Sequence, residues 1–174
     1  MRWTMTLVLA VGCLGQGEPV ATHQAALTGQ TWHNAEFGYR LALPAGATPR
    51  VEFENPPGRP GVIRQRVTVK GLSGAELLID TWDLEGGQSL EEWVGRHGEM
   101  AFYGAPNLKP RKVGPRGFPG LAGKSGGDRS PLKEFVVFAT GRHVVRLMYV
   151  NTDSGASSDD YMRMVETFDE EVAP

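Results

Sequence analysis

Residues 135–150 read FVVFATGRHVVRLMYV, and the remaining elements of the predicted fold are placed around this segment. Two runs of apolar, β-branched and aromatic residues, 135–140 and 144–150, lie on either side of Gly141. Such runs form strands, and a glycine between them allows the positive φ that a tight turn requires. The stretch therefore predicts a β-hairpin.

A helix is predicted directly after this hairpin. Residues 151–155, NTDSG, have the composition of a loop, and Ser157 or Ser158 then offers a hydroxyl that can cap the first amides of a helix. Asp159 and Asp160 follow in the first turn, where the helix dipole favours acidic side chains. The apolar residues beyond them recur at helical spacing: Tyr161, Met164, Val165 and Phe168. This apolar face is expected to lie on the hairpin.

The composition is that of one globular domain. The chain has 174 residues, of which 40% are hydrophobic and 22% charged, and its net charge is -2. This charge provides no general attraction to nucleic acid or to anionic membranes, and the apolar content argues against a disordered chain. With 23 glycines and 12 prolines the chain is rich in turns, which favours short strands over a helical bundle.

The first residues have the pattern of a secretory leader. A positively charged start and a short apolar run, MTLVLAV at residues 5–11, precede Cys13. The run is too short to span a bilayer. Residues 10–13, AVGC, resemble the lipobox of bacterial lipoproteins, although Ala10 stands where that motif most often has Leu. The resemblance implies that residues 1–12 are a signal peptide and that Cys13 carries a lipid anchor.

Cys13 is the only cysteine in the chain, so an exported protein has no disulfide to form with it. Lipidation gives the lone thiol a use, and several acyl chains on one residue are enough for stable anchoring. Leu14 rather than Asp follows it, which in such lipoproteins implies sorting to the outer membrane where one exists. The alternatives are an ordinary cleaved signal and a mis-assigned start codon. Residues 13–30 are expected to be a flexible tether to a single domain at 31–170.

Six further segments are predicted to form strands, and one is predicted to form a helix. The helix begins at Ser89, which forms a capping box with Glu92, and Gly98 is expected to end it. Residues 123–131 are expected to form a flexible loop. The six strand segments are 37–44, 51–54, 62–70, 75–82, 109–113 and 118–122.

Basic residues are concentrated in two regions of the chain. Segment 62–70 alternates apolar and polar residues, which is typical of an antiparallel strand with one face in water. If this segment and residues 109–116 are neighbours, their cations form one patch that can meet anionic lipid or a partner. The alternative is the exposed side of a sheet. The residues concerned are Arg59, Arg64, Arg66, Lys70, Lys109, Arg111, Lys112 and Arg116.

The order of the predicted elements resembles that of the PsbP/Mog1-like family. In both, an early strand ends in a turn with Pro and Gly, strands and a mid-chain helix follow, and a C-terminal helix ends in Phe. The resemblance covers roughly residues 31–168. The Trp that often follows the first turn in that family is absent, and residues 47–49, ATP, stand there. The resemblance implies an α+β fold, an α/β/α sandwich with a central antiparallel sheet.

Residues 123–127, GKSGG, match the G-x-S-x-G pattern of serine hydrolases. In that interpretation Ser125 is the nucleophile, and His143 with Asp128 or Asp153 forms the base and its support. The pattern requires a strand before it and a helix after it, whereas the sequence predicts a loop. A phosphate-binding loop is disfavoured as well, because the first glycine of that motif is missing.

No metal or cofactor is expected. The four histidines show no metal-ligand spacing, and His97 is expected to be a packed ring on the apolar face of its helix. The carboxylate pair at residues 91–92 and the pair at 159–160 lie in predicted first helical turns, where the helix dipole explains them. Aromatic residues interleaved with the cations, which nucleic-acid binding requires, are missing.

The leader and the family resemblance together predict a lipid-anchored protein of the bacterial cell envelope. Members of the PsbP/Mog1-like family include lipid-anchored envelope proteins, a photosystem accessory subunit and a partner of a small GTPase, so the resemblance implies accessory binding rather than catalysis. The expected partners are the membrane, through the lipid, and an envelope protein or a small ligand. Two alternatives remain: an envelope serine hydrolase using Ser125, and a purely structural surface lipoprotein.

Overall fold

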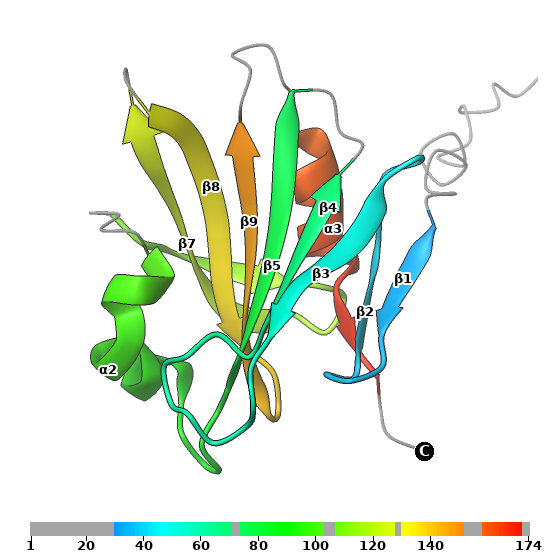
Figure 1. Cartoon of the computed structure of the whole chain (residues 1–174). Helices are drawn as coiled ribbons and strands as arrows, with labels where there is room; N and C mark the ends of the chain where they lie inside the picture. Colours follow the sequence, from blue (N-terminus) through cyan, green and yellow to red (C-terminus); the bar gives the residue numbers. More distant parts are fainter. Residues whose placement is uncertain (1–29, 71–73, 103–106, 128–129, 152–157, 172–174) are drawn as a thin grey trace, which may run out of the picture.

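The centre of the molecule is a seven-stranded antiparallel sheet with the strand order β3-β4-β5-β9-β8-β7-β6 (Figure 1). The computed structural model describes residues 30–70, 74–102, 107–127, 130–151 and 158–171. The strands of this sheet are β3 (Thr48–Glu54), β4 (Gln65–Lys70), β5 (Ala75–Asp83), β6 (Lys109–Val113), β7 (Phe118–Gly127), β8 (Ser130–Ala139) and β9 (His143–Asn151).

Two helices and a small second sheet cover the central sheet. Helix α2 (Leu90–Phe102) lies on one face, and α3 (Asp159–Thr167) lies on the other together with a three-stranded sheet (Figure 1). The predicted α+β sandwich with a central antiparallel sheet is therefore confirmed. The small sheet has the order β1-β2-β10 and consists of β1 (Thr31–Asn34), β2 (Tyr39–Ala42) and β10 (Asp169–Glu170).

Each face of the central sheet has its own hydrophobic core. On the α3 side the rings of Phe138 and Phe168 meet edge to face, with centroids 4.6 Å apart. On the α2 side Trp82 and Trp93 meet at 5.4 Å, and all four rings are buried. Successive residues of a strand point to opposite faces, so a strand covered on both sides is apolar throughout. This explains the unbroken apolar run of β8 at residues 135–139 and the apolar residues on both sides of Arg146 in β9.

The hairpin predicted from residues 135–150 consists of β8 and β9. Its turn differs from the expectation, because Gly141 does not have a positive φ. The turn is organised by Thr140 instead. Its hydroxyl accepts hydrogen bonds from the backbone N–H groups of Arg142 and His143, at 3.4 and 3.1 Å. A local hydroxyl thus performs the role that the sequence analysis assigned to the glycine.

Helix α2 begins at the predicted capping box. The Ser89 N–H donates to the Glu92 carboxylate at 2.9 Å, and the Glu92 N–H donates to the Ser89 hydroxyl at 3.2 Å. The prediction that the helix ends at Gly98 was wrong, since it continues to Phe102. A Cβ atom on Gly98 would lie 3.2 Å from both the Phe102 ring and Val94. The glycine is therefore a packing position rather than a helix end.

Helix α3 buries the predicted face. Tyr161, Met164 and Val165 are buried in the core on that side of the sheet, and Phe168 follows at the C-cap with no exposed surface. The acidic pair lies in the first turn, as expected. Ser158 occupies the N-cap position, but its hydroxyl makes no capping hydrogen bond.

Two other expectations about strands were wrong. Residues 123–131 do not form a separate loop, because β7 extends to Gly127 and β8 begins at Ser130. The polar face of β4 is mostly covered, and only Lys70 at its end is exposed. Thr68 on that face is 3% exposed, and Arg66 binds the Asp80 carboxylate on β5 at 2.6 Å. A charged partner on the neighbouring strand allows this face to be covered.

The basic residues of the two regions do not form one patch. Four strands separate β4 from β6 in the sheet order. Several of the cations are also neutralised locally, since Arg64 binds Asp83 at 3.2 Å and Arg116 binds Asp169 at 2.8 Å. None of the described helices is long and apolar enough to cross a membrane.

Candidate ligand-binding site

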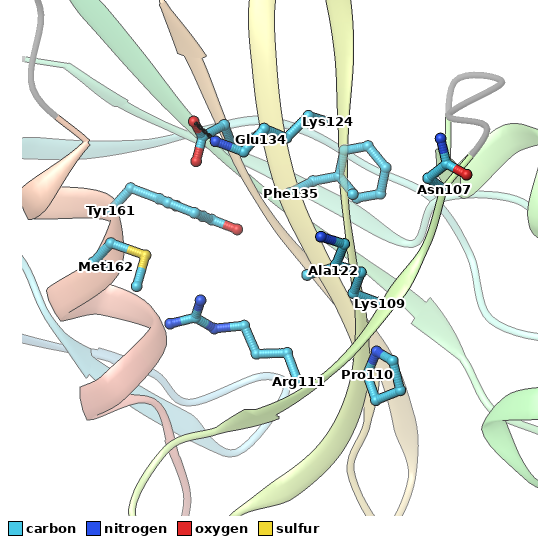
Figure 2. A pocket seen from close by; sticks show the side chains of 11 residues that line it. Asn107, Lys109, Pro110, Arg111, Ala122, Lys124, Glu134, Phe135, Tyr161 and Met162 are labelled. Carbon is cyan, nitrogen blue, oxygen red and sulfur yellow. Dashed lines mark hydrogen bonds and ion pairs between the residues drawn. The ribbon is translucent and has the colours of Figure 1, made fainter.

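A half-open pocket of about 510 Å³ lies between α3 and the β6 edge of the central sheet (Figure 2). It forms where the ladder between β6 and β7 ends. Lys109, the first residue of β6, pairs with Ala122, and β7 continues past that point to Gly127. Ligand pockets in proteins typically have volumes of roughly 300–1,000 Å³, so this one is large enough for a small organic molecule.

Two cations enter the pocket from β6. Lys109 and Arg111 are two residues apart on a strand, so their side chains lie on the same face of the sheet. This face is the one covered by α3. Ala122 is opposite Lys109 in the ladder, and it packs against the hydrophobic core on the α3 side of the sheet. Figure 2 shows both side chains directed toward Tyr161 of α3. Neither cation forms an ion pair with a carboxylate among the described residues.

Tyr161 provides a hydrogen-bonding group on the opposite wall. It is 4% exposed, and its ring extends into the pocket from α3 (Figure 2). Burial raises the pKa of its phenol above the ordinary value, while the nearby Arg111 guanidinium lowers this pKa and the Glu134 carboxylate raises it. The hydroxyl is therefore protonated at neutral pH and can donate a hydrogen bond.

The third cation of the pocket is neutralised. Lys124 on β7 and Glu134 on β8 are opposite each other across the ladder, and the ammonium nitrogen lies 2.6 Å from a carboxylate oxygen. Lys124 is largely exposed, whereas Glu134 is largely buried. Because this pair is internally compensated, the unbalanced positive charge of the pocket comes from β6.

The remaining wall is apolar. It includes Met162 of α3, Ala122 of β7 and Phe135 of β8. Gly123 lies against the Phe135 ring so closely that a Cβ atom would be 2.7 Å from the ring carbon Cζ. Gly123 and Phe135 are opposite each other in the β7–β8 ladder, and the Phe135 ring belongs to the core on the α2 face, so the glycine is required by the packing on that face.

The residues of the predicted hydrolase site do not come together. Ser125 lies within β7, opposite Lys133 of β8, and no helix follows it as a nucleophile elbow requires. His143 is the first residue of β9, whereas Val150, which pairs with Lys133, is near the last. At 3.3 Å per residue the serine and the histidine are about 20 Å apart along the strands. Asp128 and Asp153 lie outside the described residues.

His143 instead belongs to a small cluster at the other end of the sheet. Its ring lies 5.1 Å from that of Phe37 and its Nδ1 is 4.0 Å from Asp83. Burial lowers the pKa of the imidazole; Asp83 raises it and the cations Arg142 and Arg64 lower it. His97 is a half-buried ring packed against Trp93, as expected, with the ring centroids 5.5 Å apart and the planes tilted by 53°. Within the described ranges no three His, Cys, Asp or Glu side chains are grouped so as to hold a metal ion.

Cys13 and the leader at residues 1–12 lie outside the described residues, so lipidation stays a prediction. The pocket was not predicted from the sequence, in which the cations of β6 were interpreted either as part of one basic patch or as the exposed side of a sheet. One signal was available: the spacing of Lys109 and Arg111 places two cations on one face of a predicted strand. What remained hidden was that α3 covers this face.

Comparison with known proteins establishes the fold. No family model and no curated protein sequence matches this chain. A crystal structure of a protein from Bacteroides thetaiotaomicron superposes on 83% of the chain with a TM-score of 0.56 and 10% identity, and the chain spans about half of that protein, 49%. Cyanobacterial PsbP (CyanoP) from Synechocystis sp. PCC 6803 superposes on 91% of the chain and 99% of its own length, with a TM-score of 0.55 and 14% identity. The chain therefore has a PsbP-like α+β fold.

Proposed function

We propose that this chain is a non-catalytic binding module of the bacterial cell envelope, held at the membrane by a lipid on Cys13. The observation that carries the proposal is the pocket beside α3. It is large enough for a ligand and has apolar walls. Lys109 and Arg111 in it have no carboxylate partner among the described residues. Convergent polar groups in an apolar pocket are the common form of a ligand site.

The PsbP-like fold agrees with this proposal. The resemblance of the sequence to the PsbP/Mog1-like family implies accessory binding, and the fold shared with the Synechocystis protein supports the same class of function. The separation of Ser125 from His143 removes the observation on which the hydrolase alternative rested. A binding module accounts for the pocket without requiring any reacting group.

The test of this function is covalent cross-linking in intact cells. The protein is captured after cross-linking and the molecules bound to it are identified by mass spectrometry, with the Cys13→Ala chain as the matched control. We expect one partner or ligand at constant stoichiometry with the natural chain and its loss with the control. A capture that contains nothing reproducible would contradict the binding module and favour a purely structural protein.

The anchor has its own measurement. The mass of the mature protein is expected to correspond to a chain that begins at Cys13 and carries acyl groups, and the Cys13→Ala chain is expected to leave the membrane fraction. A stable mature protein without lipid would show that the anchor was wrongly assigned, and the binding function would then have to operate without it.

A further inference from the structure

The pocket beside α3 has an excess of positive charge within a chain that is slightly acidic. Three cations and one carboxylate line it, whereas the whole chain has a net charge of -2. Since Lys124 and Glu134 bind each other, Lys109 and Arg111 are left to attract an anion. Arg111 is half-buried, so solvent screens its charge less than on an open surface, whereas Lys109 is exposed at the mouth of the pocket.

The donors converge on one place. The ends of Lys109 and Arg111 and the hydroxyl of Tyr161 are directed into the same part of the pocket from β6 and from α3 (Figure 2). The Arg111 guanidinium is near enough to the Tyr161 phenol to lower its pKa, against the larger effect of burial, which raises it. A guanidinium, an ammonium and a neutral hydroxyl together offer only donors at neutral pH, which suits a carboxylate, sulfonate or phosphate group.

The rest of the pocket suits an apolar body. Met162 and Ala122 provide little hydrogen bonding, and the volume of about 510 Å³ exceeds what an inorganic anion fills. A ligand that buries an apolar group there gains hydrophobic stabilisation in addition to the ionic contacts.

We infer that this pocket binds an organic anion that has a single acidic group on a compact apolar body, with Arg111, Lys109 and the Tyr161 hydroxyl holding the acidic group. The inference rests on the proposed function as a binding module and names the class of ligand that it takes. The same chemistry is presented by a free amphiphilic acid and by an anionic lipid, in which a charged headgroup adjoins acyl chains.

The probe is 2-naphthoate, compared with 2-naphthamide, which has the same apolar body and no charge. Binding of each to the purified full-length chain is measured by isothermal titration calorimetry. The test variant is Arg111→Gln and the matched control is Lys112→Gln. Both remove one positive charge from β6, but the side chain of residue 112 lies on the opposite face of the sheet. Lys109→Gln is a second test variant, and thermal unfolding verifies that each variant is folded.

We expect 2-naphthoate to bind with an affinity about 10-fold or more above that of 2-naphthamide. Arg111→Gln and Lys109→Gln should each reduce the affinity for 2-naphthoate by about 10-fold, and Lys112→Gln by less than about 2-fold. The inference is overturned if the two probes bind equally, if 2-naphthoate shows no saturable binding, or if Arg111→Gln and Lys112→Gln have the same effect. Inorganic phosphate that binds as tightly as 2-naphthoate would overturn the apolar part of the assignment.

Two competition measurements distinguish a lipid headgroup from a free acid as the source of the anion. Phosphatidylglycerol vesicles that compete with 2-naphthoate, when phosphatidylcholine vesicles do not, assign the site to a lipid headgroup; absence of competition assigns it to a free acid. Failure of 2-naphthoate together with a reproducible cross-linked partner in cells would overturn this ligand class and leave the binding module intact. The two proposals therefore fail in distinguishable ways.

Discussion

Arg146 and Asp80 lie opposite each other on β9 and β5 and form an ion pair that is completely buried under α2. The guanidinium also donates to the Ala101 carbonyl of α2 at 2.7 Å, and its carbon lies 5.2 Å from the centre of the Trp82 ring. Asp80 in turn accepts from Arg66 on β4 at 2.6 Å. One carboxylate thus connects three strands, and through Arg146 it connects them to a helix.

Replacement of Asp80 by Asn should destabilise the protein by about 3–5 kcal/mol, because it leaves the Arg146 charge buried without its partner. Chemical denaturation at neutral pH measures this change. The double variant Asp80→Leu with Arg146→Met should recover most of the loss, since a buried pair can be replaced by apolar residues of similar size. A single Asp80→Asn variant of unchanged stability would mean that the pair is solvated.

Gly114 to Ala should cost at least about 2 kcal/mol more than Gly46 to Ala. Both glycines have a positive φ, of 67° and 78°, so both substitutions incur the same backbone strain of roughly 1–2 kcal/mol. A Cβ atom on Gly114 would lie 1.9 Å from the Phe168 carbonyl oxygen, whereas nothing lies within 4 Å of one on Gly46. Urea unfolding of both variants tests the difference, and equal losses would contradict the close approach of the β6–β7 turn to the end of α3.

The two helix starts should respond differently to loss of a serine. Ser89→Ala removes a hydroxyl that accepts the Glu92 N–H and should cost about 1 kcal/mol. Ser158 is the N-cap residue of α3, and its side chain makes no capping hydrogen bond. Ser158→Ala should therefore change the free energy of unfolding by less than about 0.5 kcal/mol. Thermal unfolding of both variants provides the comparison. A larger loss for Ser158→Ala would contradict the observed caps.

His143 should make the protein less stable as the pH falls below about 6.5, the ordinary pKa of histidine. Burial lowers the pKa of this imidazole in the folded chain, so the unfolded chain binds the proton at a higher pH and acid favours unfolding. The neutral imidazole therefore contributes its full stabilisation above the pKa that His143 has in the unfolded chain. This contribution is lost as the pH falls through the lower pKa of His143 in the folded chain. Urea midpoints at several pH values between 5 and 7 test this. The His143→Gln variant should show a weaker dependence of stability on pH. An identical dependence in the variant and the natural chain would contradict the role assigned to His143.

Ser125→Ala should leave any esterase or peptidase activity of the preparation, and its binding of 2-naphthoate, unchanged. Ser125 lies beside the register shift near the end of the β7–β8 ladder, far from His143. Initial rates with a p-nitrophenyl ester compare the two proteins. A rate that disappears with the substitution would restore the hydrolase alternative.

The parts of the fold that the sequence predicted are those determined by neighbours in the chain. The capping box at Ser89 and the apolar spacing that ends at Phe168 each depend on fewer than about ten consecutive residues. The β5–β9 pairing was not predicted, because both strands are buried on two faces and the local pattern does not specify a partner. The error at the polar face of β4 has the same origin, since Asp80 satisfies Arg66 from another strand.

The residues of the candidate site are likewise far apart in the sequence. Its wall residues come from β6 at Arg111, from β8 at Glu134 and from α3 at Tyr161, and only the folded sheet brings them together. The alternation in β6 indicated that two cations share a face. It contained no information about which element covers that face, and therefore none about a pocket.

The strand order also constrains how the chain is made. β5 ends at Asp83, but the strand that completes it, β9, begins at His143, so the ribosome must add 60 residues before the two halves of the sheet are joined. Until then the nascent meander of β3, β4 and β5 presents the bare edge of an apolar strand. Chains terminated before β9 should accordingly associate with one another through β5.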